Sequence, residues 1–368
     1  TLRGAGGASP GRGAGAALAV CAFCSLLSSC WYLKQGTAFL GERARAVPLD
    51  RALRSADAPE GLAAFAALVE DIRRFSTDEL GLKPTKNYTK YVVMDKGYVA
   101  DVVSACAADS FERHYWRYPF LGELPYKGFY DIADARAEAA RLKEAGLDVI
   151  VRQVDAFSSL GIMRDPLYSF MLDYAPDQLA ELIVHESVHA TLFVKGQDQF
   201  NEELATFVGR TGAERYVASR YGQDSPLLAE RARRRADAER FTAFLKGSGA
   251  LLEAVYTDPL LDRTAKLAEK TRILAERGRL YAETEAALFA AAGYREFDMA
   301  AINNAYIDLY RLYEEDLSPY QALLDGPAGG DLGRFMAIVN ELARAAGKAG
   351  AARGEEGDLR VLVRSYAP

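Results

Sequence analysis

The sequence predicts an α+β fold that is mostly helical, and three observations support this class. Residues 88–106 and 148–154 are rich in β-branched and aromatic residues, which is typical of strands. From about Ser225 onward, apolar and charged residues follow the period of long helices. Between these regions, the stretch HESVH carries two of the three histidines of the chain. We therefore expect a small mixed sheet, then a helical hairpin that bears these histidines, then a C-terminal helical region.

The composition is that of a globular protein, because 50% of the 368 residues are hydrophobic and 26% are charged. The formal net charge is -6 and the sequence pI is about 5.4, so we expect no binding to nucleic acid. A basic run at residues 230–240 has acidic residues interleaved, and we interpret it as a solvated helix face.

The first thirty residues have the pattern of a secretory signal. Arg3 and Arg12 precede the apolar stretch AGAALAVCAFCSLLSSC, which is too short to span a membrane as a helix. The ending LSSC at residues 27–30 resembles a bacterial lipobox, in which the cysteine thiol receives a lipid. Residues 1–29 are then a lipoprotein signal peptide and Cys30 is the lipidation site. A plain cleaved signal and an uncleaved anchor are the alternatives.

This prediction also sets the expected location of the protein. Trp31, rather than an aspartate, follows the cysteine, so we expect a lipid anchor in the outer membrane on the periplasmic side. Without lipidation the protein would be periplasmic or secreted. Once Cys21 and Cys24 leave with the signal and Cys30 carries the lipid, Cys106 has no cysteine partner within the chain.

The elements before the histidines are predicted from their breakers and caps. Residues 37–80 read as two amphipathic helices, broken near Pro48 and near residues 58–59. Strands follow within 88–106, with a turn at residues 95–97. Asp131 is the expected N-cap of a helix over 133–145, which Gly146 ends, and the strand 148–154 comes next.

The histidine segment is predicted to be a helix that starts at residues 175–177 and stops at Gly196. Its apolar stripe is Leu179, Leu182, Ile183, Leu192 and Phe193. His185, Glu186 and His189 then lie on one side of the helix, because one residue turns it by about 100°. Two imidazoles one turn apart can bind a single Zn²⁺, and the adjacent glutamate can hold a water beside it. This is the HExxH pattern of zincins.

A third metal ligand is expected from a returning helix. The linker of residues 196–198, with Asp198 as N-cap, would turn a second helix antiparallel to the first, which brings Glu202 opposite the histidines. Glu202 shares its face with Ala205, Thr206 and Gly209, which are small enough for two helices to approach closely. We assign Glu203 to a supporting or surface position. Three protein ligands leave an open position on zinc, which favours a catalytic site over a structural one.

The remaining chain is predicted to be helical. Residues 225–255 and 259–291 form a long hairpin around Asp258 and Pro259, a shorter helix covers 299–315, and another covers 329–346. The expected parts are thus the signal at 1–29, a sheet-containing part with the HExxH helices at 30–215, and a helical part at 216–368. We expect the last two to pack as one catalytic unit.

The chain resembles a bacterial family of zinc aminopeptidases in the thermolysin-like gluzincin group, many of which are lipoproteins. The resemblance rests on the matched pattern His185, Glu186, His189, Asn201 and Glu202. It continues in the segments YKGFYD, AFSSLGIMRDPL, INNAYIDLY and GGDLGRFMAIV. The chain departs from the pattern of the family at two places. Phe157 stands where a tyrosine is expected, and Ser187-Val188 replace the more usual Leu-Ala. The resemblance implies a peptide substrate and a zinc cofactor, and it implies a peptidase more firmly than an aminopeptidase.

On this interpretation Glu186 is the general base of peptide-bond hydrolysis. The resemblance implies Tyr313 as donor to the oxyanion, although Tyr310 is a second candidate and a core aromatic is the alternative for both. Phe157, Ser158 and Ser159 are predicted to lie on an edge strand that binds the substrate, or else on an ordinary strand. Other functions stay open: an endopeptidase, another amide hydrolase, or an inactive or structural-zinc lipoprotein that acts as a binding or assembly module.

Overall fold

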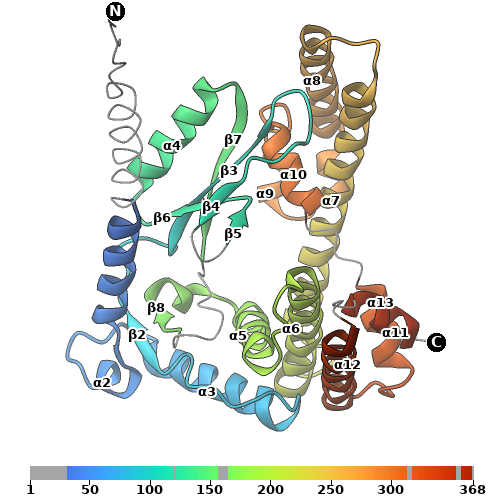
Figure 1. Ribbon diagram of the computed structural model, residues 1–368. Helices are drawn as coiled ribbons and strands as arrows, with labels where there is room; N and C mark the ends of the chain where they lie inside the picture. The colour runs from blue at the N-terminus through green and yellow to red at the C-terminus, as the bar shows by residue number, and fades with distance from the viewer. Residues whose placement is uncertain (1–30, 119–121, 156–164, 313–316, 354–357, 367–368) are drawn as a thin grey trace, which may run out of the picture. The chain divides into compact units, whose positions relative to one another are not determined.

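The computed structural model describes residues 31–118, 122–155, 165–312, 317–353 and 358–366 (Figure 1). It divides into two units, residues 1–46 and residues 47–368. In the first unit, residues 31–45 are helical. The predicted signal peptide and Cys30 lie outside the described residues. Among the residues that are described, no helix has the length and apolar character needed to cross a membrane.

The second unit contains small sheets and many helices, which confirms the predicted mostly helical α+β class. Its strands are β1 (Val47–Pro48), β2 (Lys90–Val92), β3 (Ala100–Ala107), β4 (Trp116–Tyr118), β5 (Gly122–Leu124), β6 (Lys127–Phe129), β7 (Leu147–Val154) and β8 (Leu167–Tyr168). Its helices are α2 (Leu49–Leu53), α3 (Leu62–Asp78), α4 (Ile132–Glu144), η1 (Ser169–Asp173), α5 (Pro176–Thr191), α6 (Asp198–Tyr221), α7 (Pro226–Thr257), α8 (Arg263–Leu288), α9 (Ala292–Arg295), α10 (Asn304–Leu312), α11 (Ser318–Asp325), α12 (Leu332–Arg353) and α13 (Leu359–Tyr366).

The longest strand pair joins β3 and β7, which run antiparallel from Ala100 opposite Val154 to Ala107 opposite Leu147. Strand β6 pairs with the other edge of β3, and α4 packs against this sheet. Asp131 caps α4 as predicted, because its side chain accepts a hydrogen bond from the backbone N–H of Ala133 at 2.9 Å. Gly146 turns the chain into β7 with φ +80°, a conformation that glycine adopts without strain.

Strands β2 and β3 both fall within the predicted strand region, but they belong to different sheets. Strand β2 pairs in parallel with β8, which comes immediately before η1 and α5. The local composition therefore identified the strands correctly, whereas the pairing of β2 depends on a segment about 75 residues further along the chain. In this small sheet β2 lies between β1 and β8, and α2 packs against β1 and β2. The sheet thus joins β8, at the start of the histidine-bearing region, to the elements near residue 50.

Helix α5 ends at Thr191, earlier than the predicted stop at Gly196. Leu192 is already extended, with φ -141° and ψ 117°. Lys83 provides the physical reason, because its ammonium donates to the carbonyl of Thr191 and its backbone N–H to the hydroxyl of the same residue, both at 2.9 Å. Phe193 consequently lies outside the helix and is 38% exposed, so its predicted place in the apolar stripe is wrong.

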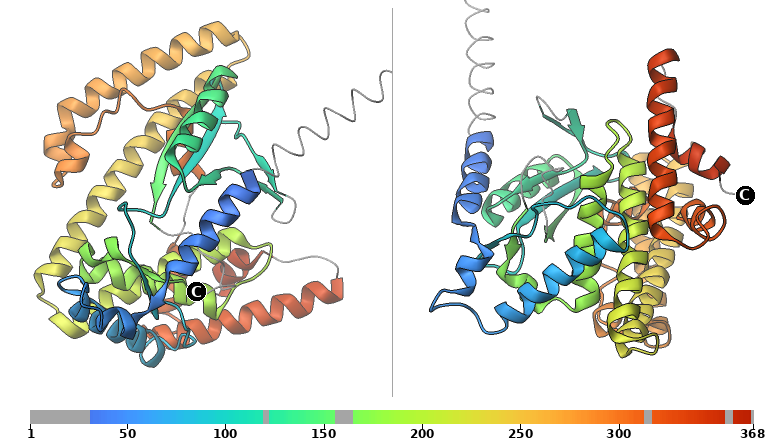
Figure 2. Two further views of the ribbon diagram at one scale, coloured as in Figure 1. Left: turned by 90° about the vertical axis from the view of Figure 1, so that its left-hand side faces the viewer. Right: turned by 90° about the horizontal axis from the view of Figure 1, so that it is seen from below.

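The C-terminal helices follow the predicted hairpin. Helices α7 and α8 meet at the loop of residues 258–262, as the two views of Figure 2 show. Residues 230–240 of α7 were predicted to form a solvated helix face, and this prediction is wrong for two of the arginines. Arg231 and Arg234 both form ion pairs with Asp177, a fully buried carboxylate in the first turn of α5. These contacts attach α7 to the start of the histidine helix.

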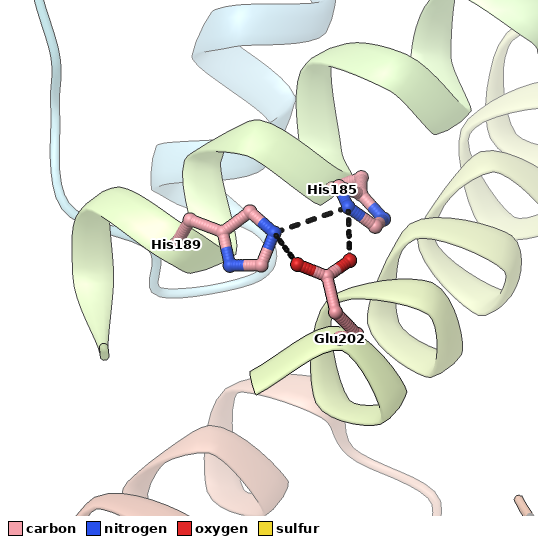
Figure 3. A group of neighbouring side chains, drawn as sticks. All are labelled: His185, His189 and Glu202. Atoms are coloured by element: carbon pink, nitrogen blue, oxygen red, sulfur yellow. Dashed lines mark hydrogen bonds and ion pairs between the residues drawn. The ribbon is translucent and has the colours of Figure 1, made fainter. Parts of the chain in front are cut away.

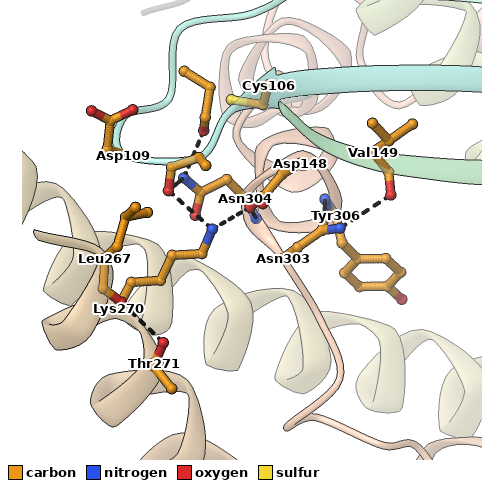
Figure 4. Close-up of polar contacts among 12 residues, drawn as sticks. Cys106, Asp109, Asp148, Val149, Leu267, Lys270, Thr271, Asn303, Asn304 and Tyr306 are labelled. Atoms are coloured by element: carbon orange, nitrogen blue, oxygen red, sulfur yellow. Dashed lines mark hydrogen bonds and ion pairs between the residues drawn. The ribbon is translucent and has the colours of Figure 1, made fainter. Parts of the chain in front are cut away.

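A polar junction around Asn304, drawn in Figure 4, joins the sheet to α7, α8 and α10. The fully buried side chain of Asn304 donates to the carbonyls of residues 107, 108 and 110, and accepts from the hydroxyl of Tyr256 at 2.8 Å. The backbone N–H of Asn304 donates to Asp148, which also pairs with Lys270. Asn303 accepts from the N–H of Tyr306, which explains why α10 begins at residue 304 instead of 299.

Candidate metal centre

The hairpin of α5 and α6 brings three metal-binding side chains together (Figure 3). His185 and His189 project from α5, and their Nε2 atoms are 3.1 Å apart. Glu202 projects from α6 toward both rings, with Oε2 3.7 Å from Nε2 of His185 and Oε1 3.5 Å from Nε2 of His189. The predicted ligands thus converge at one point between the two helices.

These distances fit a tetrahedral ion such as zinc. Two ligand atoms that are each about 2.0–2.1 Å from a tetrahedral metal lie about 3.3 Å apart. The three separations between ligand atoms are 3.1, 3.5 and 3.7 Å. Shifts of a few tenths of an ångström in these side chains would therefore bring all three atoms to bonding distance from one central ion. One carboxylate and two imidazoles are also donors that suit zinc. Among the described residues, this is the group of three that is arranged to hold a metal.

The protonation states at the site are set by burial and by neighbouring charges. Burial opposes protonation of His185, but the hydrogen bond to Glu202 and the charges of Glu186, Glu202 and Glu181 raise its pKa above the usual value. Burial, with the charge of His185 added, lowers the pKa of His189 to about 4. Burial disfavours the charged form of Glu202, yet the hydrogen bond from His185 keeps the pKa of this carboxyl below its usual value. At neutral pH, His189 is therefore neutral and Glu202 is ionised, the forms in which they bind metals.

Gly209 allows α6 to approach α5 beside the site. A Cβ atom at this position would lie 3.2 Å from the carbonyl oxygen of Glu181 and 3.2 Å from Cβ of His185. One turn further along α6, a Cβ atom at Gly212 would lie 2.9 Å from Leu80 and 3.0 Å from Val184. The predicted role of Gly209 in close helix packing is therefore supported by its contacts, because a larger residue would require α5 to shift by a few tenths of an ångström.

Asn201 closes the loop between the two helices. It is 1% exposed, its Oδ1 accepts from the N–H of Val194 at 2.9 Å, and its Nδ2 donates to the carbonyl of Val194 at 2.8 Å. The sequence pattern contained Asn201 without giving it a function. Helix α6 begins at Asp198, with Gln197 as its N-cap residue, one residue before the predicted position.

The two ring nitrogens of His189 differ, because Nε2 faces His185 and Glu202 whereas Nδ1 faces the protein interior. Its Nδ1 atom is buried and has no hydrogen-bond partner among the described residues, and the ring of Phe193 lies 6.3 Å from the imidazole ring, edge to face. Glu186 follows His185 on α5 and is partly buried, and its charge contributes to the raised pKa of His185. The predicted base thus lies beside the cluster, next in the chain to one of its ligands.

Of the other predicted site residues, the structure describes only Tyr310. Tyr313, Phe157, Ser158, Ser159 and Cys30 lie outside the described residues, so their assigned roles stay predictions. Tyr310, the second oxyanion candidate, packs against Phe241 at 5.7 Å and Tyr306 at 5.6 Å within the aromatic core beside α7 and α8. These surroundings fit the alternative prediction, in which Tyr310 is a core aromatic residue and not a donor to the oxyanion.

A comparison with protein families gives one match. The model of a family described as "Putative aminopeptidase" matches residues 30–352 of the chain, which include the sheet of β3, β6 and β7 and both helices of the candidate metal centre. No curated protein and no solved structure shows significant similarity to the chain.

Replacing Gly209 by alanine should destabilise the protein, because the added methyl group meets the backbone of α5. We expect a loss of about 1–3 kcal/mol in the free energy of unfolding, typical of overpacking. The matched control is Gly247→Ala in α7, where the nearest atom to the added Cβ is a side-chain nitrogen at 3.8 Å. This variant should gain up to about 1 kcal/mol from helix propensity. Urea unfolding of both variants measures the difference, and equal stabilities would contradict the close-packing argument.

Proposed function

The chain belongs to this aminopeptidase family, and we propose on that premise that it is a zinc-dependent peptidase of the cell envelope. The observation that carries the proposal is the convergence of His185, His189 and Glu202 from two helices within a family of peptidases. Peptides are the proposed substrates, and the family description favours those with a free amino terminus.

The number of ligands supports a catalytic function for the metal. Structural zinc sites are typically closed by four protein ligands, whereas three leave a position for the reactants. Glu202 is 45% exposed at its side chain and His185 is 24% exposed, so the cluster can be reached from outside. Zinc at this position would supply Lewis acidity, which polarises a scissile carbonyl and acidifies water.

Glu186 is the group in this chain that we assign to proton transfer. It neighbours His185 on α5, is partly buried and is not one of the three clustered ligands, and we assign it to accept a proton from the attacking water. It would then deliver this proton to the leaving amine. A site built only to stabilise the fold has no use for such a base, which favours an enzyme over a binding module.

The first test concerns the metal. Protein comprising residues 30–368 should bind close to one zinc ion, and His185→Ala or His189→Ala should lose it. Glu202→Gln should weaken zinc binding, while Glu214→Gln, the same charge change at an exposed position of α6, should leave it unchanged. Elemental analysis and competition with a chromophoric chelator measure both effects. Wild-type protein that takes up no stoichiometric zinc would refute the proposal.

The second test concerns the base. Glu186→Gln should retain zinc and fold but lose turnover by at least about 10²–10⁴-fold, the usual contribution of general-base catalysis. Glu214→Gln again serves as the control for the loss of one negative charge. The assay uses unblocked and N-acetylated peptides, since an aminopeptidase must reject the blocked ones. If wild type and Glu186→Gln both bind zinc and a partner protein yet cleave no peptide, the binding-module interpretation replaces the peptidase.

The third test concerns the location. The LSSC sequence supports a lipid anchor at Cys30, so labelled fatty acid should be incorporated into the wild-type precursor expressed in bacteria and not into Cys30→Ala. Cys106→Ala is the matched control for loss of a thiol and should be labelled like wild type. Equal labelling of the Cys30→Ala variant would show that the lipobox assignment is wrong.

A further inference from the structure

Glu203, the neighbour of the ligand Glu202, is a buried carboxylate with partners on a distant part of the chain. It is 3% exposed and accepts hydrogen bonds from Nε2 of Gln199 at 2.9 Å and from the hydroxyl of Tyr320 at 3.2 Å. Arg360 of α13 lies 4.0 Å away. A buried carboxylate is costly unless it is hydrogen-bonded or paired with a positive charge. The position of Glu203 therefore depends on these groups, and Tyr320 is itself only 1% exposed.

The same C-terminal region touches the start of α6 at further points. The backbone N–H of Leu359 lies 3.4 Å from Oε1 of Gln197, the residue at the N-terminus of α6. One turn after Glu203, the ring of Phe207 packs 5.8 Å from that of Tyr320 and 5.2 Å from that of Phe335. Residues of α11, α12 and α13 thus each contact a residue at or near the start of α6, and the three helices also contact one another (Figure 1).

These contacts matter because Glu202 and Glu203 lie in the second turn of α6, close to its start. The N-cap residue Gln197 makes no capping hydrogen bond through its side chain, so contacts from outside the helix help to hold its start. Glu202 projects from the second turn toward the histidines, about 100° around the helix from Glu203. The rotation of α6 that keeps Glu203 bonded to Tyr320 is therefore also the rotation that directs Glu202 at His185 and His189.

We propose that Glu203 and Tyr320 are positioning residues for the metal centre, and that α11 fixes the direction of the ligand Glu202 by binding its neighbour. This inference rests on the proposed zinc site. The two groups act through α6 and do not touch the metal ligands. Loss of the Tyr320 hydroxyl would leave the buried carboxylate short of a donor, and the N-terminal part of α6 would rotate to bring Glu203 toward Arg360 or water.

The test compares Tyr320→Phe with Tyr216→Phe. Tyr216 is also 1% exposed and its hydroxyl also binds a carboxylate, that of Asp71 at 3.0 Å, but it lies near the far end of α6. Both variants remove one phenol donor, so both should lower the unfolding midpoint of the metal-free protein to a similar extent. Only Tyr320→Phe should also raise the Kd for zinc, by about 10–100-fold, as outer contacts of metal ligands typically do.

Two further measurements make the outcome decisive. Co²⁺ in place of zinc reports the ligand geometry, and its visible absorption bands should shift in Tyr320→Phe and not in Tyr216→Phe. If Tyr320→Phe does not fold, Gln199→Met removes the other donor to Glu203 on an intact helix and should raise the zinc Kd in the same direction. Wild type that binds no zinc refutes the proposed function itself. Wild type that binds zinc, with the same Kd in Tyr320→Phe or with an equal loss in Tyr216→Phe, overturns the positioning role.

Discussion

The approach of α6 to α5 at Gly209 is the constraint on which the candidate site depends. The backbone of α6 passes so close to Glu181 and His185 that an added methyl group would meet both of them at 3.2 Å. Because the two backbones touch there, this contact limits how far α6 can move relative to α5 beside His185. A metal site requires ligand atoms to be placed to within about half an ångström, and this contact supplies part of the necessary constraint.

Buried charges then attach this hairpin to the rest of the protein. Asp177 in the first turn of α5 is fully buried and pairs with Arg231 and Arg234 of α7, and Asp148 of β7 pairs with Lys270 of α8. Each pair joins elements that are more than fifty residues apart in the sequence. Breaking such a pair leaves an uncompensated charge in the interior, which costs far more than the pair contributes in net stability. The pairs of Asp177 therefore attach α5 to α7, and the pair of Asp148 attaches the sheet to α8.

Local signals explain what the sequence alone could predict. The cap at Asp131, the turn at Gly146 and the histidines one turn apart each depend on residues within a few positions, so their structures follow from spacing. The end of α5 was misplaced because it depends on Lys83, which lies 108 residues away from Thr191. The burial of Glu203 was equally hidden, because its partner Tyr320 is separated from it by 117 residues. Composition identifies a strand or a charged helix face, but it does not identify the distant group that binds it.

The choice of Glu202 over Glu203 as ligand follows from the helix period once the contact at Gly209 is known. Seven residues of an α-helix make almost two complete turns, so Glu202 and Gly209 lie on nearly the same line along α6. Gly209 faces His185, and the two helices are antiparallel, so two turns back along α6 corresponds to later residues of α5. This places the backbone of Glu202 near the end of α5, and its side chain reaches the histidines, where its two oxygens each face one ring. Glu203 is rotated by about 100° from that line and meets the C-terminal helices instead. Of two adjacent glutamates, one thereby joins the candidate metal centre and the other contacts the C-terminal helices.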